Sequence, residues 1–345
     1  MKRSGYSDLP LHGGRVPAWL YSRMGKLGSA MVDVIVAEFG PAEFLSRMSD
    51  PFWFQSFGAV MGMDWHSSGM TTSVLGALKN EVNKRSNDLG LYFCGGRGKH
   101  SRATPRELMA IADQTGLDGG ELVLASKLSA KVDSAAVQDG FQLYLHGFIL
   151  SREGDWCVVQ QGMNTQSRLA RRYHWHSARL SSFVNDPHTS IVGKSVGQIL
   201  NLVDRKAASS RQGMLDIVHE PPSRILSEIP YLKMPDHHDL RVNDVNLKRL
   251  GAILYLAHET DPKDFESLLL LKGVGPRTLQ SLALVSEIIY GTPSRFTDPA
   301  RFAFAHGGKD GHPFPVPLTV YDETITFLND IVVKSKIDRS DKIQA

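Results

Sequence analysis

The sequence predicts an α+β fold, in which a mixed α/β N-terminal body precedes an all-α C-terminal domain. Three observations lead to this class. Apolar residues recur with helical spacing up to about residue 90, alternate as in strands between residues 139 and 176, and regain helical spacing from about residue 246. A stretch rich in Pro and His over residues 221–245 separates the two parts. We therefore expect a body over residues 1–220, a linker over 221–245 and a helical domain over 246–338.

The composition is that of an ordinary globular protein. The chain has 345 residues, 42% of them hydrophobic, which is enough for the cores of two or three domains. No segment approaches about 18 uninterrupted apolar residues, so we expect a cytoplasmic protein with no membrane partner. Two cysteines argue against a disulfide framework. Because the net charge is only +3, affinity for nucleic acid must come from local clusters of basic residues.

Helices are expected over the first third of the chain. Val32, Ile35 and Phe39 fall at helical spacing, and Gly40-Pro41 interrupts the pattern. The aromatic run over residues 51–57 is interpreted as part of a core.

A strand from Leu91 is expected to run into a glycine-rich basic loop, which ends where a capped helix starts at Thr104. The loop contains three glycines and four basic side chains, a composition that favours an anion. The spacing of a Walker phosphate-binding loop is absent, so ATP is not the expected ligand. We expect Arg97, Lys99 and Arg102 to bind DNA phosphates, with a solvated basic turn as the alternative.

A β-hairpin is expected next. Residues 141–150 alternate between apolar and polar, Glu153-Gly154 forms the turn, and residues 156–162 return. The acidic residue before the hairpin and the glutamines of its returning strand leave open a divergent metal-dependent nuclease, although the expected Asp/Glu-x-Lys is missing.

A short helix led by Arg168, Arg171 and Arg172 is expected after this hairpin, followed by His174 and His176. In an extended segment the two histidines share a face, which is a workable spacing for metal ligands, although no third ligand can be identified. A sheet with polar edges and hydrogen-bonded histidines is the alternative.

The most specific motif is Leu-Leu-Leu-Leu-Lys-Gly-Val-Gly-Pro-Arg-Thr over residues 268–278. Its two glycines permit a tight turn, and their N–H groups lie at the start of the next helix, where a phosphate can bind. This pattern is that of a helix-hairpin-helix, which usually contacts a nucleic-acid backbone; a glycine C-cap followed by another helix is the alternative. The expected backbone-binding residues are Lys272, Gly273, Val274, Gly275, Arg277 and Thr278.

After a helix ending near Tyr290, the chain continues with Gly291, Pro293 and Asp298. In this order of residues, the region 247–328 resembles the helix-hairpin-helix DNA glycosylase superfamily. The resemblance implies that Asp298 enters an active-site cleft. Bifunctional members form a Schiff base with a lysine where this chain has Arg277, which stays protonated, so a monofunctional mechanism is implied. A helix N-cap is the alternative for Asp298, and it is compatible with the catalytic role.

A glycine-rich loop over residues 304–317 follows closely. It holds too few apolar residues to be core, and we expect His306, Lys309 and Asp310 to line the same cleft, where they position water or bind phosphate. An ordered turn held by Asx hydrogen bonds is the alternative.

Four segments together resemble an uncharacterised conserved family, domain of unknown function 763. They are residues 94–101, 158–164, 271–278 and 304–317. The resemblance covers most of the chain, but it implies no reaction.

These motifs predict a DNA-repair enzyme, a hydrolase of the glycosylase type that needs no cofactor. A damaged or modified base is flipped into a pocket, and Asp298 stabilises the oxocarbenium-like sugar or directs water to it. One alternative is a structure-selective nuclease that uses Mg or Mn and docks on duplex or junction DNA through the C-terminal motif. A non-catalytic DNA-binding adaptor is the other.

Overall fold

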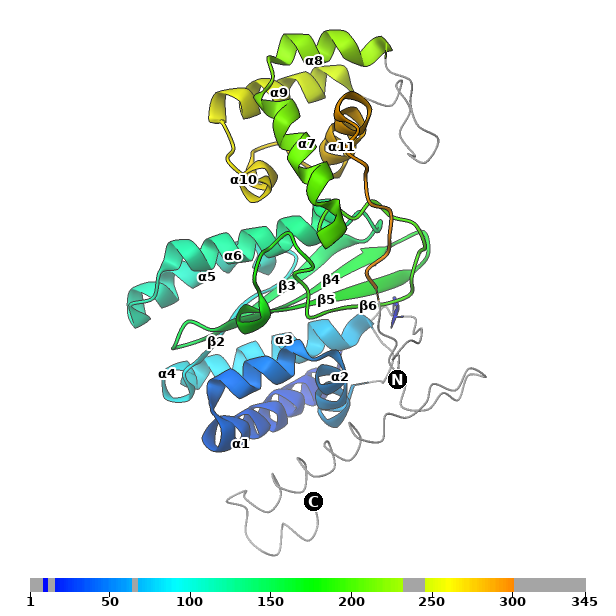
Figure 1. Ribbon diagram of the computed structural model, residues 1–345. Helices are drawn as coiled ribbons and strands as arrows, with labels where there is room; N and C mark the ends of the chain where they lie inside the picture. Colours follow the sequence, from blue (N-terminus) through cyan, green and yellow to red (C-terminus); the bar gives the residue numbers. More distant parts are fainter. Residues whose placement is uncertain (1–8, 12–15, 64–67, 232–245, 301–345) are drawn as a thin grey trace, which may run out of the picture.

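The computed structural model describes residues 9–11, 16–63, 68–231 and 246–300, and these form an α+β fold with helices on both faces of one antiparallel sheet (Figure 1). The strand order is β1-β5-β4-β3-β2, and β6 pairs with β5. The strands are β1 (Leu9–Pro10), β2 (Leu91–Arg97), β3 (Gln142–Ser151), β4 (Trp156–Asn164), β5 (Leu169–His176) and β6 (Ser190–Val192).

Three N-terminal helices cover one face of the sheet: α1 (Ala18–Ser49), α2 (Pro51–Val60) and α3 (Ser68–Val82). The predicted break in α1 is confirmed, because Gly40 has a φ of +82° and leaves the helical conformation. The short helix α4 (Ser86–Leu89) leads into β2. The aromatic run of α2 contributes Phe54 and Phe57 to the core of this layer, as expected.

The other face carries two further layers. Helices α5 (Lys99–Thr115) and α6 (Gly119–Lys131) lie next to the sheet, and the remaining helices stack beyond them (Figure 1). One hydrophobic core runs through both layers. The outer helices are α7 (Ala208–His219), α8 (Pro222–Glu228), α9 (Leu247–Thr260), α10 (Phe265–Leu270) and α11 (Pro276–Tyr290).

The stretch expected as a linker begins with a helix. Pro222 starts α8, and Ile225 is buried in the same core as α9. Residues 232–245, the rest of that stretch, lie outside the described residues. None of the described helices is both long and apolar enough to cross a membrane.

The helix expected over residues 168–172 is wrong, because these residues enter β5. Arg168 has a φ of +57° and belongs to the turn, while Arg171 and Arg172 pair with Gly162 and Gln161 of β4. Successive strand residues face opposite sides of a sheet, so each arginine reaches a different layer of buried polar groups. Pairing with strands on both sides overrides the local helical pattern.

The expected start of α5 is also wrong, since the helix begins at Lys99 rather than at Thr104. Pro105 then lies inside it and has no N–H for the carbonyl of Ser101, one turn earlier. The Thr104 hydroxyl donates to that carbonyl instead, at 2.8 Å. Lys99 and Arg102 therefore lie in the first turns of a helix and not in a loop.

Gly95 allows β2 to approach both β3 and α5 closely. Its φ is +80°, and a Cβ placed on it would lie 2.2 Å from the His146 carbonyl oxygen and 2.7 Å from Thr104 Oγ1.

Gly95→Ala should lower the free energy of unfolding by at least about 2 kcal/mol, as measured by urea denaturation. Gly98→Ala is the control, because a Cβ there meets nothing within 4 Å and only the cost of a φ of +59° remains. Equal losses in the two variants would contradict this packing.

Candidate functional site

Residues 271–275 join α10 to α11, and we call them the α10–α11 turn. Gly273 adopts a φ of +91°, and Val274 is buried in the core. Gly275 is the N-cap of α11 and offers no capping side chain, while Pro276 occupies the first helical turn. The first N–H groups of a helix have no acceptor one turn earlier, so this helix start presents uncapped donors.

The turn is attached to the C-terminal end of α6. Lys131 Nζ donates to the Val274 carbonyl at 2.6 Å, and Gln138 Nε2 donates to the Pro276 carbonyl at 2.8 Å. Burial lowers the pKa of Lys131. Both side chains therefore donate to backbone carbonyl oxygens, one within the turn and one in the residue that follows it.

Lys272, Gly273 and Arg277 are exposed around the turn. Arg277 also donates to Gln280 at 3.2 Å. Thr278 is buried, and its hydroxyl has no hydrogen-bond partner among the described residues. The six residues of the sequence motif thus lie together.

Arg97, Lys99 and Arg102 are exposed where β2 ends and α5 begins. Arg97 lies 5.8 Å from the centre of the Tyr144 ring. Arg102 lines a cavity together with Lys127 of α6.

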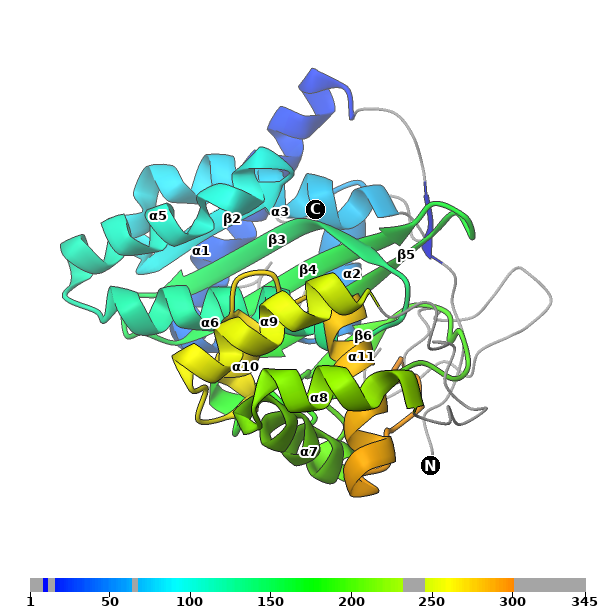
Figure 2. The same cartoon turned by 90° about the horizontal axis from the view of Figure 1, so that it is seen from above.

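Helix α6 connects this region to the α10–α11 turn. Lys127 and Lys131 are one helical turn apart, about 6 Å along the axis. Lys131 contacts the turn, and Lys127 lines the cavity beside Arg102. Figures 1 and 2 both place α10 against α6. We call Arg102, Lys127, Lys131, Lys272 and Arg277 the α6 basic surface.

The cavity on this surface has a volume of about 340 Å³. Ser126 and His146, both almost fully buried, line it, and Ser126 Oγ lies 2.9 Å from His146 Nε2. On the other side of the ring, His146 Nδ1 lies 2.8 Å from Gln160 Oε1. Gln160 Nε2 in turn donates to Asp133 Oδ2 at 2.5 Å.

This chain of hydrogen bonds sets the tautomer of His146. The Asp133 carboxylate also accepts from Trp175 Nε1 at 3.0 Å and contacts His188 Nε2 at 2.5 Å. Only the amide nitrogen of Gln160 can donate to a carboxylate, so its oxygen accepts and His146 carries its proton on Nδ1. The lone pair on Nε2 then accepts from the Ser126 hydroxyl.

Burial shifts the pKa values of His146 and Asp133 in this chain of hydrogen bonds. It lowers the pKa of His146 to about 4, with the hydrogen bond to Gln160 acting the other way. Burial also raises the pKa of Asp133, and the contact with His188 opposes that rise. His146 is therefore a neutral imidazole at pH 7.

The other face of the sheet holds a separate buried polar network. Gln161, the neighbour of Gln160, accepts from Thr71, and Arg172 donates to Thr71 and to Gln55. Burial lowers the pKa of Arg172 to about 9.

His174 and His176 share this face, as predicted, but they do not assemble a metal site. His174 lies 3.2 Å from the Met48 carbonyl through Nδ1 and accepts from Arg172 Nε at 3.1 Å through Nε2. His176 is buried, and its ring nitrogens have no partner among the described residues. No group of three His, Cys, Asp or Glu able to hold a metal occurs in residues 9–11, 16–63, 68–231 and 246–300.

Asp298 is engaged in a buried ion pair. Arg171 donates to both of its carboxylate oxygens, at 3.0 and 2.8 Å, and also donates to Asp139 at 2.9 Å. The N–H groups of Val196 and Ala300 complete the set, at 2.7 and 2.9 Å. The Asp298 side chain is 1% exposed. Both oxygens are therefore already bonded, an arrangement that suits a structural carboxylate, and the contact with Ala300 resembles the capping role expected as the alternative.

The remaining predicted residues, His306, Lys309 and Asp310, lie outside the described residues. Sequence reasoning missed Ser126 of α6, His146 of β3 and Asp133 of the π-helical turn over Val132–Ala136. It considered Gln160 of β4 only as one of the glutamines of a metal-dependent nuclease. No spacing rule joins them, because the sheet brings them together.

Comparison with known proteins gives one match. A family model described as "Protein of unknown function (DUF763)" matches residues 5–316. The chain belongs to the DUF763 family. No curated protein and no solved structure matches it. The DUF763 match includes the α6 basic surface, the cavity and the ion pair of Asp298, but its description assigns no chemistry to them.

The ion pair in this DUF763 protein predicts a stability effect. Asp298→Asn leaves Arg171 with one anionic partner and should lower the free energy of unfolding by about 3 kcal/mol, measured in urea. Asp113→Asn, at an exposed position on α5, should change it by less than about 0.5 kcal/mol. Unchanged stability of Asp298→Asn would mean that the carboxylate is not paired.

The hydrogen-bond chain predicts the state of His146. Nitrogen NMR of the histidine-labelled protein at pH 5.5 should show a neutral ring with its proton on Nδ1, because the pKa of His146 is depressed from 6.5 to about 4. The unfolded chain takes up this proton at higher pH, so the residue lowers stability as pH falls from 6.5 towards 4.

Two neighbouring glutamines provide the matched variants for this measurement. Gln160→Leu removes the acceptor and should disturb the tautomer, whereas Gln161→Leu, on the opposite face, should leave it unchanged. A protonated His146 at pH 5.5, or a proton on Nε2, would overturn the assignment.

Proposed function

We propose that this protein binds DNA and holds its phosphodiester backbone at the α10–α11 turn and along the α6 basic surface. The observation that supports this is the exposed start of α11, which has glycine at its N-cap and lies between Lys272 and Arg277. The sequence of the turn resembles the helix-hairpin-helix, whose glycines leave room for a phosphate.

The physics of this helix start favours an anion. Uncapped N–H groups and the positive end of the helix dipole both attract a phosphate oxygen. Val274, buried in the core, and Lys131, bonded to its carbonyl, hold the turn in place before any ligand arrives. A preorganised turn loses little entropy on binding.

The charges continue away from the turn in one direction. Lys131 and Lys127 follow α6 towards Arg102, so a strand bound at the turn meets further cations along its length. Contacts with phosphates carry no sequence information, which supports binding that depends on backbone and salt rather than on base sequence.

Base excision through Asp298 is not part of this proposal, because Arg171 and two backbone N–H groups bond its oxygens. A Mg or Mn nuclease is not proposed either, since the described residues bring together no three metal-binding side chains.

The double variant Lys272→Ala/Arg277→Ala should weaken binding of a labelled duplex at least tenfold in fluorescence anisotropy. The slope of log K against log salt between 50 and 200 mM should become shallower by about 2, since two phosphate contacts are lost.

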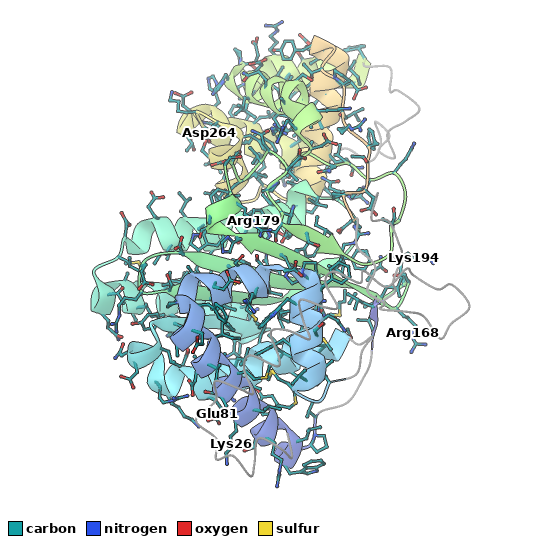
Figure 3. All side chains as sticks on the ribbon, turned by 60° about the horizontal axis from the view of Figure 1, so that its bottom comes forward. Lys26, Glu81, Arg168, Arg179, Lys194 and Asp264 are labelled. Carbon is teal, nitrogen blue, oxygen red and sulfur yellow. The ribbon has the colours of Figure 1, made fainter. Side chains whose placement is uncertain are left out.

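The control is Arg23→Ala/Lys26→Ala, which removes the same two residue types from exposed positions on α1. Figure 3 shows Lys26 at the opposite end of the molecule from Asp264, the N-cap of α10. Equal loss of affinity in both double variants would attribute binding to overall charge and would refute the proposed surface.

A further inference from the structure

The cavity on the α6 basic surface is lined by residues that the binding of a phosphate backbone does not by itself require. A network whose only purpose is to satisfy buried polar groups is complete once each donor has an acceptor. Asp133, Gln160 and Trp175 fit that description. Ser126 and His146 differ, since their contact forms part of the wall of a cavity that Arg102 and Lys127 also line.

The direction of the hydrogen bonds is informative. Each proton in the chain points towards Asp133: Gln160 donates to the carboxylate, His146 donates to Gln160, and Ser126 donates to His146. The Ser126 hydroxyl thus donates its hydrogen bond to a base, and this contact does not use the lone pairs of its oxygen. This is the order of groups that activates a hydroxyl nucleophile: an acceptor orients the imidazole, and the imidazole accepts the hydroxyl proton.

The backbone contributes to this arrangement. Helix α6 continues directly into the π-helical turn over Val132–Ala136, which carries Asp133. The same continuous segment therefore supplies Ser126 at one end of the chain of hydrogen bonds and Asp133 at the other. Such π-helical insertions occur frequently at functional sites.

We infer that Ser126 is a nucleophile and His146 its general base in a site for phosphate diesters, with the substrate's charge met by Arg102 and Lys127. Identification of DNA as the substrate rests on the proposed function above. Gln160 and Asp133 are positioning residues, because they act through His146.

The reaction balances without a further reactant except water. Ser126 Oγ attacks phosphorus as its proton passes to His146 Nε2; the Oγ–P bond forms and one P–O ester bond breaks. The imidazolium returns the proton to the departing sugar oxygen. Water then attacks the phosphoserine, its proton passes to His146 and on to Oγ, and the O–P bond to Ser126 breaks. The products are a phosphate monoester and an alcohol.

The charge that appears on His146 during attack has a partner. Gln160 accepts from the Nδ1–H and is itself polarised by the Asp133 carboxylate. Burial lowers the pKa of His146 to about 4, so the ring is in its base form at neutral pH but is a weak base. The negative charge of a bound phosphate diester favours the imidazolium that forms during attack.

The test uses the full chain in EDTA with two probes. The first is bis(4-nitrophenyl) phosphate, a small diester that does not need the α10–α11 turn. The second is a duplex with a bridging sulfur at the scissile position, whose sulfur leaves readily and allows the phosphoserine adduct to accumulate. Adducts are detected on denaturing gels and mapped by mass spectrometry.

We expect hydrolysis of the small diester and an adduct on Ser126. Ser126→Ala should abolish both, and His146→Gln should slow them at least a hundredfold. Ser129→Ala is the matched control on α6, because the Ser129 hydroxyl bonds only the Ser126 carbonyl in the described contacts, and it should retain turnover. If Ser126→Ala does not fold, mapping of the adduct in the wild-type protein decides.

The outcomes separate the two proposals. DNA binding with no adduct and no hydrolysis of either probe overturns the catalytic inference and leaves the binding proposal intact. Hydrolysis of the small diester that requires Ser126, with no DNA binding, supports the catalytic inference and refutes DNA as the ligand. An adduct on any residue other than Ser126 also overturns the inference.

Discussion

The structure depends on the need to satisfy polar side chains buried in the middle of the sheet. Gln160 and Gln161 are neighbours on β4, and Arg171 and Arg172 are neighbours on β5. Each pair sends one side chain to each face, and all four residues are fully buried. A buried polar group without a partner costs about 1–3 kcal/mol, so the helical layers on both faces must supply partners at specific positions. The sheet thus constrains where the helices can pack.

The two faces meet this constraint differently. On the face that α1, α2 and α3 cover, the partners include Gln55 and Thr71, which are neutral. On the opposite face the partners include three carboxylates: Asp133 and Asp139, which lie six positions apart after α6, and Asp298, which lies after α11. The bonds to Arg171 tie the chain after α11 to the sheet, and those around Asp133 tie the end of α6. The helices on this face are therefore held at two places, and the α10–α11 turn is held close to the cavity.

Local signals predicted part of this arrangement. Alternation and the turn at Glu153-Gly154 predicted the β3–β4 hairpin, and Pro276 and Gly291 predicted the ends of α11. The first half of β5 was missed because its arginines have the polarity of an exposed helix, and their burial depends on partners such as Gln55 and Asp298, each more than 100 residues away. Ser126 and His146 were missed for the same reason: neither has a motif around it, and they meet only when α6 packs on β3.

Helix α6 carries both Lys131, which fastens the α10–α11 turn, and Ser126, which lines the cavity, and the two residues are five positions apart in one rigid element. The distance between the two residues along the helix axis is therefore fixed at about 8 Å. If a DNA strand binds at the turn, the phosphodiester that lies at Ser126 would be at the same position relative to the bound phosphate, whatever the base sequence. The position of cleavage relative to the bound phosphate would then be set by the rise per residue of a protein helix.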